Sequence, residues 1–176
     1  MVCGVCLQHP PAFDAVCCPY LFKGPITQII HNIKHSTKVK GLREIESQLI
    51  HLLAQHDFDA IIPLPYHWLK LLRRGHSPTH TISRHLAKQL QVPIIHGLKR
   101  SKATQSQQGL DKPQRQRNMR KAFAPTGQSP SLKGLNLLLV DDVLTTGATA
   151  HAAALELKRL GAKSVILGCL ARTPLS

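Results

Sequence analysis

The stretch from residue 135 to residue 150, LNLLLVDDVLTTGATA, decides the fold of this 176-residue chain. Its apolar start leads directly into Asp141 and Asp142, although the whole chain has only nine acidic residues. A short apolar run bounded by polar turn residues is typical of a buried parallel strand. We therefore predict a strand over 135–140, followed after a turn by a helix over 148–160.

The turn between this strand and this helix has the composition of an anion-binding site. Backbone N–H groups at a helix start attract anions. Thr145, Thr146 and Thr149 add hydroxyl donors, and Gly147 lets the backbone approach a ligand closely. Ligands of open parallel sheets bind beyond the carboxyl ends of the strands, so the two aspartates would stand beside this phosphate cradle.

Carboxylates bind a diol or hold a divalent cation, so the whole pattern favours a sugar phosphate such as a ribose 5-phosphate. Because neighbouring side chains of a strand point to opposite sides, we expect at most one aspartate to face a given ligand atom. An alternative stays open, in which the aspartates cap the helix and the threonines only form a turn.

Helical and strand-like segments alternate along the rest of the chain. Apolar residues at helical spacing predict two amphipathic helices, Ser77 and Pro78 predict the capped start of a third, and Gly161 predicts the end of the last. The predicted helices lie near 26–33, 42–53 and 77–90, and the further strands at 59–65, 92–98 and 163–171. This order predicts an α/β fold, with a mostly parallel twisted sheet flanked by helices.

The formal net charge of +14 indicates a polyanionic partner, such as nucleic acid or a phosphorylated metabolite. Half of the excess lies at residues 99–121, which hold eight Lys or Arg and one acid and show no apolar period. We expect a mobile basic loop there. Aromatic residues make up only 4% of the chain, which argues against platforms for base stacking.

The sequence shows neither an 18-residue apolar run nor a secretory signal, so we expect no membrane insertion and a cytoplasmic protein. Its five irregularly spaced cysteines do not form a disulfide framework. Cys169, within the last predicted strand, is expected to be a buried small hydrophobe.

The segment LLLVDDVLTTGAT resembles the phosphoribosyl pyrophosphate (PRPP) binding motif of type I phosphoribosyltransferases. Three further segments are similar to the ComF/GntX family: IPLPYHWLKLLRRGHSPTHTISRHLAKQL, TQSQQGLDKPQRQRNMRKAF and the terminal CLART. Within the second, the matching residues are Gln107, Gly109, Leu110, Arg115, Asn118 and Phe123. The resemblance extends from about Cys3 to Thr173 and implies the type I phosphoribosyltransferase fold.

The resemblance also implies site residues. Asp141 and Asp142 would bind the ribose hydroxyls of PRPP, directly or through Mg²⁺, and would be the catalytic pair. The PRPP-binding segment as a whole would comprise Val140, Asp141, Asp142, Val143, Leu144, Thr145, Thr146, Gly147, Ala148 and Thr149. Near the pyrophosphate we expect Arg73, Arg74 and Gly75, with Arg115 and Asn118 from a loop over 99–122 that closes over PRPP.

Cys3 and Cys6 have the spacing of zinc ligands, but a structural zinc site needs four. Relatives of this family usually open with two such pairs, and this chain resembles one that begins at the second pair. We therefore expect residues 1–24 to be the remnant of a Cys-rich, zinc-finger-like segment with a lead-in strand. Zn²⁺ would then be absent, and residues 25–176 would form the phosphoribosyltransferase-like domain.

The resemblance implies a PRPP-binding protein that acts in natural competence and DNA uptake, with phosphoribosyl transfer as its reaction. Thr145 stands where purine-salvage enzymes of the hypoxanthine–guanine type carry an acid, so the acceptor and its general base stay unassigned, with His67 and His76 as candidates. The alternative is a non-catalytic module that binds single-stranded DNA or senses PRPP. Partners would then include PRPP, single-stranded DNA and proteins of the competence machinery, and a homodimer stays open.

Overall fold

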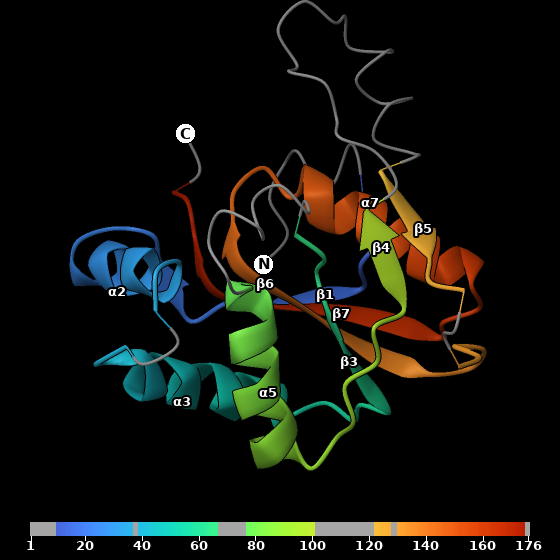
Figure 1. The fold of residues 1–176 in the computed structure, drawn as a ribbon, viewed down its shortest axis with the longest axis horizontal. Helices are drawn as coiled ribbons and strands as arrows, with labels where there is room; N and C mark the ends of the chain where they lie inside the picture. The colour runs from blue at the N-terminus through green and yellow to red at the C-terminus, as the bar shows by residue number, and fades with distance from the viewer. Residues whose placement is uncertain (1–9, 37–38, 67–76, 101–121, 128–129, 175–176) are drawn as a thin grey trace, which may run out of the picture.

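The computed structural model describes residues 10–36, 39–66, 77–100, 122–127 and 130–174. Helices and strands alternate along most of this length (Figure 1). In chain order they are β1 (Ala15–Cys17), β2 (Tyr20–Leu21), α2 (Pro25–Ile33), α3 (Leu42–Leu53), β3 (Ala60–Pro63), α5 (Pro78–Leu90), β4 (Leu98–Arg100), β5 (Phe123–Pro125), β6 (Asn136–Leu144), α7 (Ala148–Arg159) and β7 (Ser164–Arg172).

The main sheet has five strands, in the order β1-β7-β6-β3, with β2 also pairing with β7. All of its strand pairs are parallel. Strands β4 and β5 form a separate antiparallel pair. The predicted α/β class with a mostly parallel sheet is therefore confirmed, and the carboxyl ends of β3, β6 and β7 meet at one edge.

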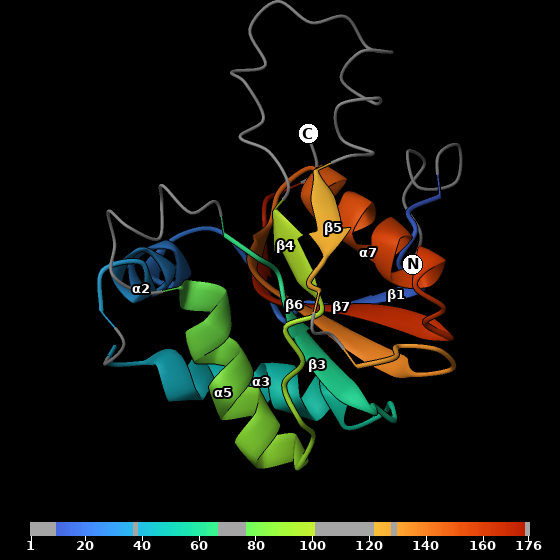
Figure 2. The same cartoon turned by 45° about the vertical axis from the view of Figure 1, so that its right-hand side comes forward.

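Helices cover both faces of the sheet (Figures 1 and 2). One core joins the sheet to α7 and includes Leu137, Leu139 and Leu167. The other joins it to α2, α3 and α5 and includes Leu138 and Ile166. Each fully buried aliphatic side chain of this kind stabilises the fold by about 1.5–3 kcal/mol, so β6 and β7 are the centre of the molecule in energy as well as in position.

Local signals set the helix ends as predicted. The Ser77 side chain caps α5 by accepting a hydrogen bond from the His80 N–H, and Pro78 is the first helical residue. Gly161 lies just after the end of α7 and has a φ of 95°. A Cβ atom on this residue would lie 3.2 Å from the Lys133 backbone. Both the dihedral and this close approach require glycine.

Two strand predictions are corrected. Strand β6 does not end at Val140 but continues through both aspartates to Leu144, because β7 pairs with it as far as Arg172. The predicted strand 92–98 is largely wrong. Within this range, the contact with the main sheet is one isolated bridge, between Ile61 and Ile94. Only Leu98 belongs to a strand, and that strand is β4, which pairs with β5 outside the main sheet.

The other elements lie close to their predicted ranges, and Cys169 is fully buried as expected. A lead-in strand, β1, lies within the predicted N-terminal segment, whereas Cys3 and Cys6 lie outside the described residues. Of the helices that the structure describes, none is both long enough and apolar enough to cross a membrane.

Candidate functional site

Asp141 and Asp142 lie near the carboxyl end of β6, where the sheet meets the start of α7. Each carboxylate is fixed by the backbone. The Asp142 N–H donates to Asp141 Oδ1 at 2.8 Å, and the Val143 N–H donates to Asp142 Oδ1 at 2.9 Å. The two carboxyl groups are also close enough to influence each other, since the charge of Asp142 raises the pKa of Asp141. Both acids therefore belong to one site.

The outer oxygen of Asp142 is held by two other segments. The Tyr66 hydroxyl, just after β3, donates to Oδ2 at 3.0 Å, and Lys34 Nζ, at the end of α2, lies 3.7 Å from the same oxygen. The side chain of Asp142 is 9% exposed. A ligand that binds this oxygen must therefore share it with Tyr66 and Lys34 or replace them.

The folded protein disfavours the ionised form of Asp141. Burial raises its pKa well above the usual range, and the charge of Asp142 and the hydrogen bond between the two carboxyl groups raise it further. Lys34 acts in the opposite direction. Two neighbouring carboxylates whose charges oppose each other mark a place where negative charge is in excess and where a cation is favoured.

Arg100 brings a positive charge to the same region from the end of β4. Its guanidinium lies over the Phe123 ring, 5.6 Å from the ring centre. Burial lowers the pKa of Arg100, and the charges of Asp141 and Tyr66 oppose this effect. Its Nε is buried and has no hydrogen-bond partner among the described residues. Because a guanidinium stays charged, this buried donor favours an anionic ligand.

The predicted phosphate cradle follows the acidic pair directly. Helix α7 begins after Gly147, which has a φ of 73° and provides no side-chain cap. The Ala148 N–H lies 3.5 Å from Thr146 Oγ1, and both Thr145 and Thr146 are exposed. The alternative in which the aspartates cap this helix is wrong, because Gly147 is the capping residue and the aspartates bind N–H groups within β6.

The described part of the PRPP-like segment thus forms one continuous strand, turn and helix start. Val140 is fully buried beneath it, while Val143, Leu144 and Thr149 are half-buried along its sides. The other predicted ligands lie outside the described residues. These are Arg73, Arg74, Gly75, Arg115 and Asn118, together with the histidine candidates His67 and His76 and the cysteines Cys3 and Cys6.

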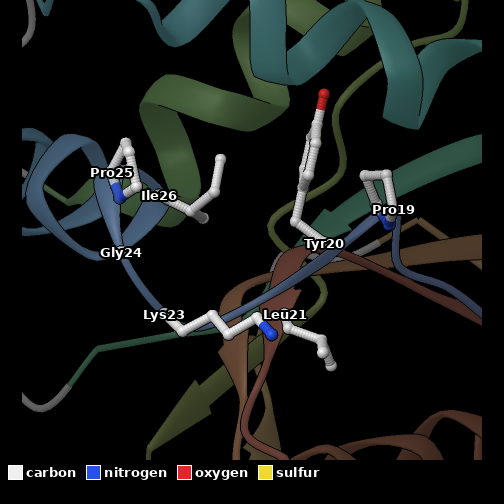
Figure 3. Close-up of a pocket in the computed structure, with 7 residues that line it drawn as sticks. All are labelled: Pro19, Tyr20, Leu21, Lys23, Gly24, Pro25 and Ile26. Carbon is white, nitrogen blue, oxygen red and sulfur yellow. The ribbon is translucent and has the colours of Figure 1, made fainter.

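A groove of about 480 Å³ opens beside this edge, between β2 and the start of α2 (Figure 3). Since β2 pairs with Ala171 and Arg172, the groove lies next to the carboxyl end of β7. Its surface is mainly apolar, and it contains none of the predicted site residues. The lining residues are Pro19, Tyr20, Leu21, Lys23, Gly24, Pro25 and Ile26.

The acidic pair fits Mg²⁺ better than it fits zinc. Mg²⁺ binds through one or two carboxylates together with water and phosphate oxygens, which matches two adjacent acids beside a phosphate cradle. Within the described ranges, no three His, Cys, Asp or Glu side chains gather as a complete protein-made metal site would require. Asp141 and Asp142 are therefore the residues that would hold Mg²⁺, with the remaining ligands supplied by substrate and water.

Sequence reasoning missed Tyr66, Lys34 and Arg100 as members of the site. Tyr66 had a usable signal, since it follows the apolar strand 59–65 and strand ends of a parallel sheet share one edge. Arg100 was one basic residue among eight in its stretch, and nothing near it distinguished it. Lys34 had no signal, because its approach to Asp142 depends on how α2 packs over the sheet.

The chain is similar to known proteins in sequence and in fold. A family model described as "Phosphoribosyl transferase domain" matches residues 35–175. The chain is 31% identical to the DNA utilization protein YhgH of Shigella flexneri and 28% identical to Competence protein F of Haemophilus influenzae. Both comparisons cover 97% of this chain and 78% of the relative.

Among solved structures, the chain is similar to the adenine phosphoribosyltransferase of Leishmania tarentolae. The TM-score is 0.50 and the sequence identity 17%, over 81% of this chain and 60% of that one. At this identity the likeness concerns the fold alone.

Proposed function

The chain belongs to the phosphoribosyltransferase domain family and, within it, to the ComF family, and on this premise we propose that it binds PRPP with Mg²⁺. Asp141 and Asp142 bind the ribose diol, directly or through the metal. The turn from Thr145 to Thr149 binds the 5′-phosphate. The substrate class is thus a ribose phosphate activated by pyrophosphate.

One observation carries this proposal: two adjacent carboxylates lie near the end of β6, just before a helix start that has no side-chain cap. A diol and a phosphate separated by one sugar ring present matching groups to these two places. Excess negative charge between the acids favours a cation, and the N–H groups of α7 favour an anion. A simple turn or a capped helix requires neither feature.

The residues of the site divide the binding task among them. Asp141 and Asp142 orient the sugar ring by accepting hydrogen bonds from its hydroxyls, and Tyr66 holds Asp142 in place for this. In this proposal Arg100 neutralises the pyrophosphate together with Arg73 and Arg74. Mg²⁺, when bound, supplies positive charge to the departing pyrophosphate. Transfer of the phosphoribosyl group to a nucleophile is the reaction that this arrangement supports, and a PRPP sensor is the alternative use of the same site.

The proposed process is the handling of incoming DNA. Its support is the pair of names carried by the relatives, competence and DNA utilization, over nearly the whole chain. A protein that works in this process as a PRPP-dependent enzyme or sensor would connect DNA uptake to nucleotide supply.

Isothermal titration calorimetry with PRPP and Mg²⁺ tests the binding proposal. We expect saturable heat for the wild type and at least a tenfold loss of affinity for Asp141→Asn. Asp57→Asn is the matched control, because Asp57 is exposed and lies before β3, away from the carboxyl edge. No heat with the wild type, or equal losses in both variants, would reject the proposed site.

A second function, binding of single-stranded DNA, is favoured by the net charge of +14. Phosphate contacts release counterions, so binding through Lys and Arg weakens steeply as salt rises. The low aromatic content favours contacts to the backbone without base stacking. This function is compatible with PRPP binding, and competition between PRPP and DNA would show whether they use one surface.

A further inference from the structure

Two cysteines from distant parts of the chain lie side by side at the edge of the main sheet. Strand β1 pairs with β7 in parallel, with Cys17 opposite Gly168. The next residues in this register are Cys18 and Cys169. On the other side of β7, Cys169 is paired with Asp141 of β6. Cys18, directly after the end of β1, thus continues the row formed by the paired residues Cys169 and Asp141.

The thiols of Cys18 and Cys169 are close enough for each to shift the pKa of the other, and both are free cysteines. Paired residues of neighbouring strands lie about 4.8 Å apart. This separation falls within the range of about 4.4 to 6.8 Å that disulfides span between Cα atoms. A covalent bond between these sulfurs therefore requires side-chain rotation and little backbone movement.

The two sulfurs differ in how they can react. Cys169 is fully buried, whereas Cys18 is half-buried and follows the end of β1. The hydrogen bond from Cys169 lowers the pKa of the Cys18 thiol, and Arg172 and the Tyr20 backbone act in the same direction while burial opposes them. Thiolate character and access are what make a cysteine react with oxidants. Cys18 is thus the residue that meets an oxidant first, and Cys169 is placed to react with it afterwards.

From this arrangement we infer that Cys18 and Cys169 form an oxidation site, in which a hydroperoxide converts the pair to a disulfide. The Cys18 thiolate attacks one oxygen of the peroxide, so that an S–O bond forms and the O–O bond breaks. The leaving oxygen takes a proton and departs as water or an alcohol. Cys18 is then a sulfenic acid.

The second step joins the strands. The sulfur of Cys169 attacks the sulfur of Cys18, so that the S–S bond forms and the S–O bond breaks. The oxygen leaves as hydroxide and becomes water with the proton from the Cys169 thiol. The two sulfurs lose two electrons in total, and the two oxygens of the peroxide gain them.

The neighbouring Cys17, the last residue of β1, provides a matched control. It is buried, its side chain belongs to the core on the opposite face of the sheet, and its thiol points to the Leu52 carbonyl at 3.9 Å. Burial raises the pKa of the Cys17 thiol. Chain position alone would make Cys17 and Cys18 equivalent, but the fold separates them.

Peptide mapping tests the inference on the intact 176-residue chain. The reduced protein is treated with hydrogen peroxide, its remaining thiols are alkylated, and the cross-linked peptides are identified by mass spectrometry. We expect loss of two hydrogens and one new cross-linked peptide joining Cys18 to Cys169, which a reductant removes. Cys17→Ser is expected to leave this peptide unchanged.

Two further variants separate the steps. In the variant Cys169→Ser, the reaction is expected to stop at the sulfenic acid of Cys18, which a 1,3-dione captures. In the variant Cys18→Ser, the thiol of Cys169 is expected to stay reduced. Far-ultraviolet circular dichroism checks that each variant is folded, and the wild-type map stands without them. A cross-link from Cys18 to Cys3, Cys6 or Cys17, or full alkylation of Cys18 and Cys169 after peroxide treatment, would overturn the inference. Neither result depends on PRPP binding.

Discussion

At the scale of a single residue, the charge of Asp141 opposes folding. Its carboxyl group is buried beside a second acid, and Lys34 only partly balances the charge. An ionised carboxylate in such a place destabilises the folded state until a cation or a proton joins it. Local costs of this kind are expected at functional sites, in agreement with the proposed ligand site.

The variant Asp141→Asn should therefore be more stable than the wild type at neutral and higher pH, by about 0.5–2 kcal/mol. The amide oxygen can still accept the hydrogen bond from the Asp142 N–H, while the buried charge is gone. Because the pKa of Asp141 is raised in the folded state, the wild type takes up a proton as pH falls through that raised value. The difference in the free energy of unfolding between the variant and the wild type should then become smaller.

Urea unfolding across a pH series measures this difference, with Asp57→Asn as the exposed control. A variant that is less stable than the wild type at pH 8 would contradict the assignment of Asp141 as a strained acid.

Arg100 should be a binding residue for the charged part of the ligand. Arg100→Gln is expected to weaken PRPP affinity by roughly 10- to 100-fold, since hydrogen bonds to charged groups contribute about 1.5–3 kcal/mol. The PRPP affinity of Arg100→Lys should lie between those of the wild type and Arg100→Gln, because lysine keeps the charge but lacks the planar guanidinium fork. Calorimetry against PRPP and against pyrophosphate alone measures both losses.

Arg159→Gln is the matched control, because its side chain is 70% exposed at the far end of α7. Equal affinity of Arg100→Gln and the wild type for pyrophosphate would remove Arg100 from the site.

At the scale of the elements, α3 and α5 are joined by a buried polar contact. Glu46 is 3% exposed, and its Oε2 and Oε1 lie 3.0 Å and 3.1 Å from His85 Nδ1. Burial raises the pKa of Glu46, and His85 acts against this effect. The two helices are thus joined through a buried acid, and His85 stabilises the ionised form of that acid.

Removal of the partner should destabilise the protein more than removal of both. His85→Ala leaves the Glu46 carboxylate buried without its partner and should lower the free energy of unfolding by about 1–3 kcal/mol. Adding Glu46→Gln to this variant should restore part of the loss, because the buried charge is removed as well. Chemical denaturation of the two single variants and the double variant gives the coupling between the residues. Additive losses would show that the contact contributes nothing.

The sequence predicted the elements better than it predicted their contacts. The caps at Ser77 and Gly161 depend on neighbouring residues, so they could be identified along the chain. The length of β6 could not, since its last residues are a strand only because β7 pairs with them. Asp141 and Asp142 were identified by their motif, whereas Tyr66 and Lys34 reach Asp142 only through tertiary packing.

For the whole molecule, the unequal distribution of charge is the main feature. The chain has 23 Lys or Arg against nine acids, and four of those acids are buried or half-buried, namely Glu46, Asp141, Asp142 and Glu156. The surface is therefore even more positive than the total suggests, and it should attract nucleic acid over long distances at low salt.

Single-stranded DNA should bind with an affinity that falls as salt rises, by about 0.7 in log–log slope for each phosphate contact. If the basic stretch makes these contacts, replacing Arg115, Arg117, Arg120 and Lys121 with Gln should reduce the slope by up to about 3. Fluorescence anisotropy at several salt concentrations gives the slope. The control set replaces four exposed bases elsewhere, namely Arg84, Lys88, Lys133 and Lys163. An equal change in both sets would show that the charge acts as a whole and that residues 101–121 are not the contact.

The hairpin of β4 and β5 has a consequence for protein engineering. Its pairs run from Leu98 opposite Pro125 to Arg100 opposite Phe123, so residues 100 and 123 lie side by side. A two-residue Asn-Gly turn could join residues 101 and 122 directly and replace everything between them. By loop-closure entropy, this shortening would stabilise the chain by roughly 2 kcal/mol. The result would be a minimal scaffold, in which the sheet and its acidic pair can be studied apart from the basic segment.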